Sequence, residues 1–166
     1  MNRPPHVTHF FLAHVLVSVS SESTDPAVIR SIAVSADDLV TALETTETSS
    51  TEAVLRVTPP FSGRMRARLH IDRGTSYTDE PEPLHISPRS LVDDTVPSYP
   101  KPAETANELR SDPSVEYSVE RHHARHRDAV EQWRKRVPEA VKEQATVETA
   151  AGSQTISVTV LGDSID

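Results

Sequence analysis

The chain has 166 residues, and its 25 Asp and Glu outnumber its 17 Lys and Arg, so the formal net charge is -8. A chain of this length is expected to form one domain with a substantial core. It contains no Cys, which excludes disulfides, thiolate metal sites and a cysteine nucleophile. No segment approaches the run of about eighteen apolar residues that spans a bilayer, so we expect a cytoplasmic protein without a membrane partner.

Residues 1–25 stand apart from the rest of the chain. They contain one apolar run, from Phe10 to Val19, which His14 interrupts. The run faintly resembles a secretory signal, and its alternating valines would also suit an added strand. A disordered segment or a wrongly assigned start is the remaining interpretation, so no functional hypothesis depends on these residues. A single domain is expected over residues 26–166.

The domain is predicted to begin with a strand and a helix. Apolar and β-branched residues predict the strand over 27–34. Ser35 followed by Asp38 resembles a capping box, with Asp where Glu is more usual. The helix that this cap begins is expected to run to about Thr45.

Residues 53–57 and 63–71 predict a β-hairpin around a loop that contains proline and glycine. In the second segment aliphatic residues alternate with Arg64, Arg66 and Arg68. Side chains of a strand alternate between two faces. We therefore expect the aliphatic face to be buried and the other face to display the three guanidinium groups and the imidazole of His70.

The second half of the domain is predicted to be mainly helical and to close with a hairpin. Proline and polar residues mark the boundaries of its elements. In chain order we expect an exposed loop at 74–83, a short strand at 84–86, a helical turn from 88 to 94, an extended segment at 96–102, a helix at 102–110, and a hairpin of 146–148 with 154–161.

The longest predicted helix begins at Asp112-Pro113, because a capping residue followed by proline is a common helix start. Pro138 is expected to interrupt it near Val137. Apolar and histidine side chains recur along it every three or four residues, as in a helix that lies on a core. This stripe consists of Val119, His123, His126, Val130, Trp133, Val137 and Ala140.

The order of these elements favours an α+β fold over alternating βαβ units. We expect a mostly antiparallel sheet of about five strands, with one long helix and two or three short ones packed on one side. Phosphate-binding loops, dinucleotide fingerprints and nucleophile elbows are absent, and the chain has only four glycines. The sequence therefore identifies no catalytic residue and no cofactor, and it favours a protein that is not an enzyme.

Two clusters of arginine are candidate binding surfaces. Between residues 56 and 73, five Arg stand against one Asp, a local charge of +4. Guanidinium groups about 6.6 to 7 Å apart along a strand roughly match successive phosphates of a nucleic acid, and they could equally bind an acidic partner. They could also pair with the chain's own acids, such as Asp79, Glu80 and Glu82. The cluster consists of Arg56, Arg64, Arg66, Arg68 and Arg73.

The second cluster lies on the long predicted helix and includes Arg121, Arg125 and Arg127. Acidic residues at helical spacing could partly neutralise these arginines, and the cluster would then be an ordinary solvated helix face. Two basic clusters in an acidic chain nevertheless favour a contact surface. If the arginines only paired with acids of the same chain, they would not need to be clustered.

Histidines of the same helix are candidate metal ligands. His122 and His126 are four residues apart, so their imidazoles could share a divalent ion. The HExxH pattern is absent and no obvious third ligand is nearby. A packing role that responds to pH is the other interpretation, for His123 and His126.

The composition is rich in carboxylate, Ser and Thr, and only three of the 17 basic residues are Lys. In this respect the chain resembles small uncharacterised proteins of halophilic archaea. Two stretches carry the same likeness, VLRVTPPFSGRMRARLHI at 54–71 and VEYSVERHHARHRDAVEQWRKRV at 115–137. The resemblance implies stability in high salt and no particular function.

These observations lead to three functional hypotheses. The first is a non-enzymatic binding or adaptor protein whose contact surface contains Arg64, Arg66 and Arg68 and whose partner is a protein. The second is a nucleic-acid-binding protein that uses both arginine clusters. The third is a metal-dependent enzyme or metal-binding protein with His122 and His126 as ligands. The oligomeric state is left open.

Overall fold

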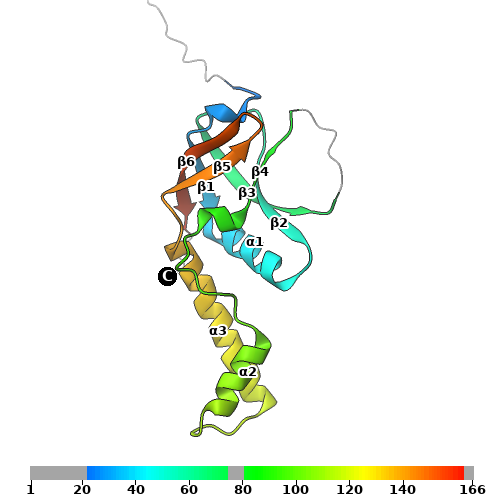
Figure 1. The fold of residues 1–166 in the computed structure, drawn as a ribbon, viewed down its shortest axis with the longest axis vertical. Helices are drawn as coiled ribbons and strands as arrows, with labels where there is room; N and C mark the ends of the chain where they lie inside the picture. Colours follow the sequence, from blue (N-terminus) through cyan, green and yellow to red (C-terminus); the bar gives the residue numbers. More distant parts are fainter. Residues whose placement is uncertain (1–21, 75–80, 163–166) are drawn as a thin grey trace, which may run out of the picture.

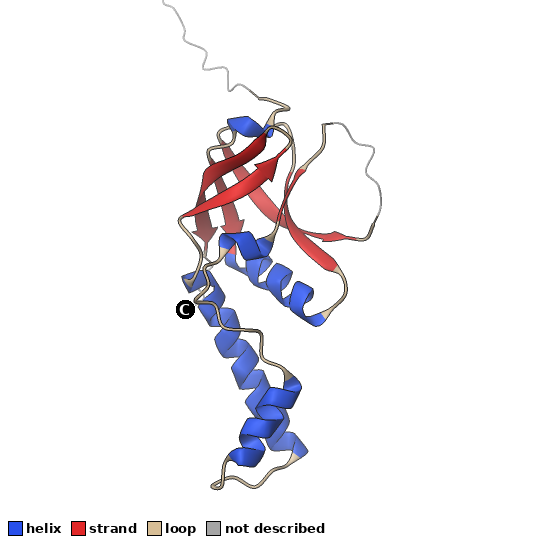
Figure 2. Ribbon diagram, viewed as in Figure 1, coloured by secondary structure: helices blue, strands red, loops and turns tan. Residues whose placement is uncertain are grey.

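A computed structural model describes residues 22–74 and 81–162 (Figure 1). A curled sheet forms one end of the molecule, and a pair of helices projects from it. Figure 2 shows the strands gathered at one end and the longer helices toward the other. The interpretations of residues 1–21, and the possible pairing with Asp79 and Glu80, lie outside the described residues.

The first strand, β1 (Ser31–Ser35), begins later than predicted. The residues before it form a short 3₁₀ turn, η1 (Pro26–Val28), because the Asp25 side chain accepts a hydrogen bond of 2.9 Å from the Ala27 amide. Alternate residues of β1 are buried, as the aliphatic pattern predicts.

The helix that follows, α1 (Ala36–Thr48), begins at the predicted cap. Ser35 Oγ accepts a hydrogen bond of 3.2 Å from the Asp38 amide, which satisfies one of the free donors of the first turn. The helix ends beyond the predicted Thr45. Hydroxyl groups near its end, such as that of Thr46, donate back to carbonyls one turn earlier instead of breaking it.

The predicted hairpin is confirmed. β2 (Glu52–Val57) and β3 (Arg64–Asp72) pair antiparallel, with Leu55 opposite Leu69. The short strand β4 (Leu84–Ile86) pairs antiparallel with the other edge of β2.

The closing hairpin is also confirmed. β5 (Gln144–Thr149) and β6 (Gly152–Leu161) pair antiparallel around a tight turn. Gly152 adopts a φ of 114° at this turn, a conformation that residues with a Cβ rarely take. Of the aliphatic residues on the inner side of β6, Ile156 is fully buried, while Val158 and Val160 are half-buried.

The arrangement of the strands differs from the prediction. The fold is α+β, but the sheet has six strands in the order β4-β2-β3-β1-β6-β5, and β1 runs parallel to both of its neighbours. The expected mostly antiparallel sheet of five strands is therefore wrong. Parallel neighbours need long connections, and β1 has them, through α1 and β2 to β3 and through most of the chain to β6. The sheet curls until its edge strands β4 and β5 meet.

The remaining helices follow the prediction in part. Ser87 precedes a 3₁₀ turn, η2 (Pro88–Leu91), and α2 spans Pro102–Ser111. The long helix α3 (Val119–Glu139) ends soon after Pro138, so the predicted interruption there is confirmed.

The predicted start of α3 at Asp112 is wrong. Ser118 Oγ caps the helix instead, accepting a hydrogen bond of 3.2 Å from the Arg121 amide. The Asp112 carboxylate accepts a hydrogen bond of 2.9 Å from the Ser114 amide and holds a turn between the two helices. This turn brings α3 back against α2, whereas a helix from Asp112 would have continued from α2.

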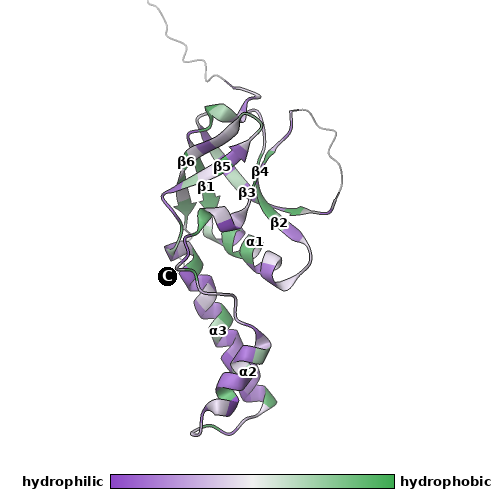
Figure 3. Ribbon diagram, viewed as in Figure 1, coloured by the Kyte–Doolittle hydropathy of each residue, from purple (hydrophilic) through white to green (hydrophobic). Residues whose placement is uncertain are grey.

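The hydrophobic core lies inside the curled sheet and under α1. Figure 3 shows hydrophobic residues on the strands and α1, while the projecting part of α2 and α3 is mostly hydrophilic. The predicted stripe of α3 is buried at Val130, Trp133 and Val137. It is wrong at its first turns, because Val119 is 60% exposed and His123 is exposed. No helix in the described part of the chain could cross a bilayer.

Candidate binding surface on the sheet

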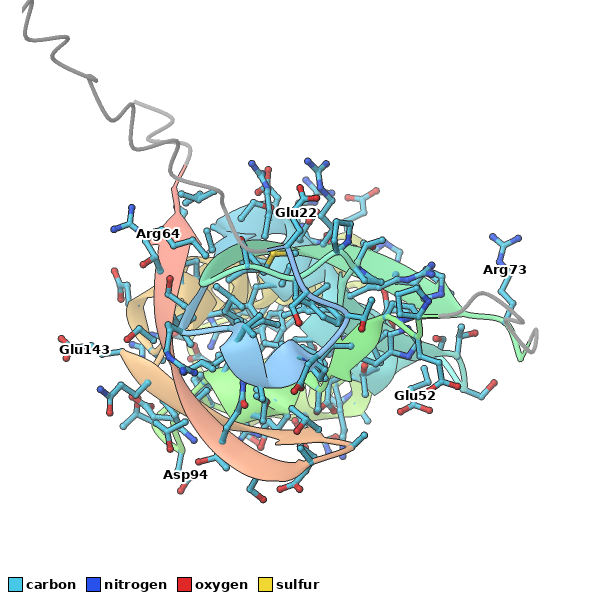
Figure 4. The ribbon with its side chains drawn as sticks, turned by 90° about the horizontal axis from the view of Figure 1, so that it is seen from above. Glu22, Glu52, Arg64, Arg73, Asp94 and Glu143 are labelled. Carbon is cyan, nitrogen blue, oxygen red and sulfur yellow. The ribbon has the colours of Figure 1, made fainter. Side chains whose placement is uncertain are left out.

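The row of arginines on β3 has the predicted geometry. Arg64, Arg66 and Arg68 are all exposed on the outer face of the sheet, whereas Ala67 between them is buried in the core. Figure 4 shows Arg64 with its side chain directed away from the core. The alternation along an extended strand therefore presents three cations on one side, as expected.

None of the three guanidinium groups has a counterion among the described residues. Their side chains form no ion pair and no hydrogen bond with residues 22–74 or 81–162. Pairing with Glu82, one of the acids considered for this role, is therefore not observed. In the described part of the chain, the positive charge of the row is therefore exposed to solvent and is not compensated by any side chain.

Short uncharged residues lie beside the row on the same face. Ser31 of β1 is opposite Arg64, and Ala33 is opposite Arg66. On the next strand, β6, the corresponding positions hold Ser157 and Thr159, both exposed. We call this surface the arginine face. It consists of Arg64, Arg66, Arg68, Ser31, Ala33, Ser157 and Thr159.

Two carboxylates lie near one end of the arginine face, in the first turn of α1. Asp37 and Arg66 line the same shallow hollow of about 230 Å³, but they form no ion pair. Asp38 points elsewhere, and its Oδ2 accepts a hydrogen bond of 3.2 Å from the Leu69 amide. That amide lies beyond the last pair of β1 and β3, Val34 and Ala67, so Asp38 has a structural role there.

The other two arginines of this cluster lie at different places. Arg56 of β2 is directly opposite Arg68 and next to His85 of β4. Arg73 follows the end of β3 and points away from the molecule (Figure 4). The structure therefore brings Arg56 to the side of the row and leaves Arg73 beyond its end.

The helical arginines belong to a separate region. α3 carries Arg121, Arg125 and Arg127 on its first half, which projects from the sheet (Figure 1). Arg121 donates a hydrogen bond of 2.6 Å to the Glu116 carbonyl, and Arg125 lies 4.0 Å from a carboxylate oxygen of Glu108. The two arginine clusters therefore do not form one continuous surface.

The candidate metal ligands lie at the contact between α2 and α3. His122 Nε2 is 3.1 Å and His126 Nδ1 is 3.2 Å from the hydroxyl of Thr105, which is 3% exposed. His122 Nε2 is also 2.9 Å from the Pro102 carbonyl oxygen. Among the described residues no three His, Cys, Asp or Glu side chains gather as a metal site. The metal hypothesis gains no support, and both rings have a packing role.

The comparison with known proteins identifies a family. The Domain of unknown function (DUF8009) matches residues 19–162. The chain belongs to this family. No curated protein and no solved structure matches it. The matched range contains every described strand, so the arginine face lies wholly within the DUF8009 domain.

One polar cluster of the DUF8009 domain has no counterpart in the sequence predictions. Glu44 of α1 accepts hydrogen bonds from Arg134 of α3 and from the Tyr99 hydroxyl. Arg134 lowers the pKa of Glu44, while burial and the bond to Glu44 raise the pKa of Tyr99 to about 12. Glu44 and Arg134 are ninety positions apart, so no local pattern relates them. The cluster anchors the projecting helices to α1.

Proposed function

We propose that the protein is a non-enzymatic binding module and that the arginine face is its contact surface for an anionic partner. The observation that carries this proposal is the row of three exposed guanidinium groups without a counterion among the described residues. The chain has 25 acidic residues that could neutralise such a row. A row that the described residues of so acidic a protein leave without a counterion is best explained by a negatively charged ligand.

The chemistry of the arginine face suits that role. A guanidinium group is always charged near neutral pH and can bind a carboxylate or phosphate through two parallel hydrogen bonds. The hydroxyls of Ser31, Ser157 and Thr159 add neutral donors beside the row. A strand in the middle of a sheet holds these groups at fixed spacing, so binding costs little ordering of the backbone.

A nucleic acid is the second candidate partner, because arginine and hydroxyl groups also contact phosphates. Two observations make it the less favoured one. The arginine face contains no Phe, Tyr or Trp on which bases could stack, and the imidazoles of His70 and His85 beside it stack on each other at 5.7 Å. The net charge of -8 also repels a polyanion at long range.

The test is a comparison of partners captured from a native lysate by the wild-type protein and by two triple variants. Each variant removes three positive charges, the first from the arginine face and the second from exposed positions elsewhere. The first should lose partners that the wild type and the second retain, and the loss should be clearest at low KCl, where charges are least screened. The same partners captured by all three proteins would contradict the proposal. The variants are Arg64→Gln/Arg66→Gln/Arg68→Gln and Lys135→Gln/Arg136→Gln/Lys142→Gln.

A further inference from the structure

We propose that the partner of the arginine face is an acidic segment of a protein, one that presents carboxylates in a row. This inference rests on the proposed function and specifies the chemistry of the ligand. Its basis is the spacing of the arginines, the shape of the surface beside them, and the charge of the whole chain.

The spacing of the arginines matches the repeat of an extended polypeptide. Arg64, Arg66 and Arg68 occupy alternate positions of one strand. Their successive Cα atoms are therefore about 6.6 to 7 Å apart, which is the length of two residues of extended chain. An extended polypeptide with an acid at every second position has the same repeat. Laid along β3, such a segment places one carboxylate opposite each guanidinium group, and each pair can form two hydrogen bonds.

The space beside the row is low and uncharged. On this side of the sheet β1 and β6 present Ser31, Ala33, Ser157 and Thr159, with Leu161, which is 38% exposed, at the end near α1, and neither strand places a charge there. Strands lie about 4.8 Å apart, so these two make a low strip roughly 10 Å wide, enough for one extended chain. The hydroxyls of Ser31 and Ser157 can donate to the carbonyl or carboxylate oxygens of a chain that lies there. Asp37, in the first turn of α1, lines the same hollow as Arg66 and so borders this strip.

The face is poorly suited to nucleic acid. Three arginines contact only about three phosphates, and so few contacts give weak binding. The face has no Phe, Tyr or Trp to add stacking, and the imidazoles of His70 and His85 beside it already stack on each other. The rest of the chain is acidic. An acidic segment of a protein carries its negative charge over a few residues. The acidic remainder of this chain therefore repels it less than it repels a nucleic acid.

The experiment measures fluorescence anisotropy with purified protein and defined probes. The test probe is a short labelled peptide in which Glu alternates with Thr, and its control has Gln in place of Glu. Single-stranded and duplex oligonucleotides are the competing probes. The proteins are the wild type, the two triple Gln variants, and a triple Lys variant of the arginine face. The Lys variant keeps the charge but loses the planar fork of the guanidinium group.

The Glu peptide should bind the wild type and the control variant alike. The Gln variant of the arginine face should bind it about tenfold to a hundredfold more weakly, as expected for three exposed ion pairs. The Lys variant should fall between them, and the Gln peptide should not bind. Unchanged Trp133 fluorescence will show that each variant is folded, since this side chain is buried in the core on α3 and packs against Tyr99.

The contrary outcomes separate the inference from the proposed function. Oligonucleotide binding that depends on the three arginines, with no peptide binding or with equal peptide binding, overturns the inference and leaves the proposed function standing. Absence of binding to every probe, or binding that ignores the arginine substitutions, overturns both.

Discussion

The Glu44 carboxylate joins α1 to α3 and to the segment that precedes α2. Arg134 donates to it through two nitrogens, with Nη2 at 2.7 Å from Oε1 and Nε at 3.1 Å from Oε2. The Tyr99 hydroxyl donates to Oε1 at 2.8 Å. Replacing Glu44 by Ala removes all three hydrogen bonds at once, and we expect it to weaken the attachment of α3.

The size of the effect follows from how exposed the pair is. The side chain of Glu44 is 22% exposed and that of Arg134 is 41% exposed. Fully exposed ion pairs contribute about 0.2 to 1 kcal/mol, and buried hydrogen bonds to a charged group about 1.5 to 3 kcal/mol. For this half-exposed pair we expect Glu44→Ala to lower the free energy of unfolding by about 2 kcal/mol. Glu47→Ala is the matched control, since this exposed side chain of the same helix forms no hydrogen bond or ion pair with the described residues, and it should change stability by less than about 0.5 kcal/mol.

The effect should also depend on pH. Hydrogen bonds from Arg134 hold the pKa of Glu44 below its ordinary value of 4.5, so the folded state favours the ionised form. The resulting stabilisation is complete above that value and is lost as the pH falls through the lower pKa of the folded state. Glu44→Gln cannot ionise. Its stability should therefore approach that of the wild type as the pH falls below 4.5.

The measurement is urea unfolding followed by the fluorescence of Trp133, the single Trp of the chain. This side chain is 4% exposed and its ring packs edge-on against Tyr99 at 4.9 Å, so it reports on the junction directly. Equal losses of stability for Glu44→Ala and Glu47→Ala would refute the reasoning. A constant difference between wild type and Glu44→Gln from about pH 6 to pH 3 would refute its electrostatic part.

Three further predictions concern the helices and the overall charge. Ser118→Ala should lower the free energy of unfolding by about 1 kcal/mol, because it removes the cap of α3; an unchanged thermal unfolding curve by circular dichroism would contradict this. Thr105→Val should cost about 1 kcal/mol or more and speed amide hydrogen exchange in α2, because two histidines of α3 lose their partner; unchanged exchange would argue against that contact. The free energy of unfolding should rise from dilute buffer to molar KCl as carboxylate repulsion is screened, and equal stability in both would show that the repulsion is negligible.

The features predicted correctly are those that a short window of sequence specifies. The alternation around Arg66 predicted both the strand and its exposed face, because the two faces of a strand differ in solvent contact. Ser35 predicted the start of α1, because a cap acts within one turn. The α2 boundaries and both hairpins follow from equally local signals.

The start of α3 shows where local signals compete. Asp112 followed by proline and Ser118 both have the chemistry of a helix cap, and the first lies directly after α2. The structure uses Ser118, because the chain must turn before α3 can pack on α2 and place His122 beside Thr105.

The sequence by itself determined most of the elements, the inward and outward sides of β3, and the row of cations on that strand. Only the tertiary structure decided that β1 lies between β3 and β6, that uncharged residues therefore flank the row, and that Glu44 meets Arg134. The physical reason is that periodicity records which side of an element is buried. Periodicity does not show which distant element lies beside that side, because the neighbour depends on how the whole core packs.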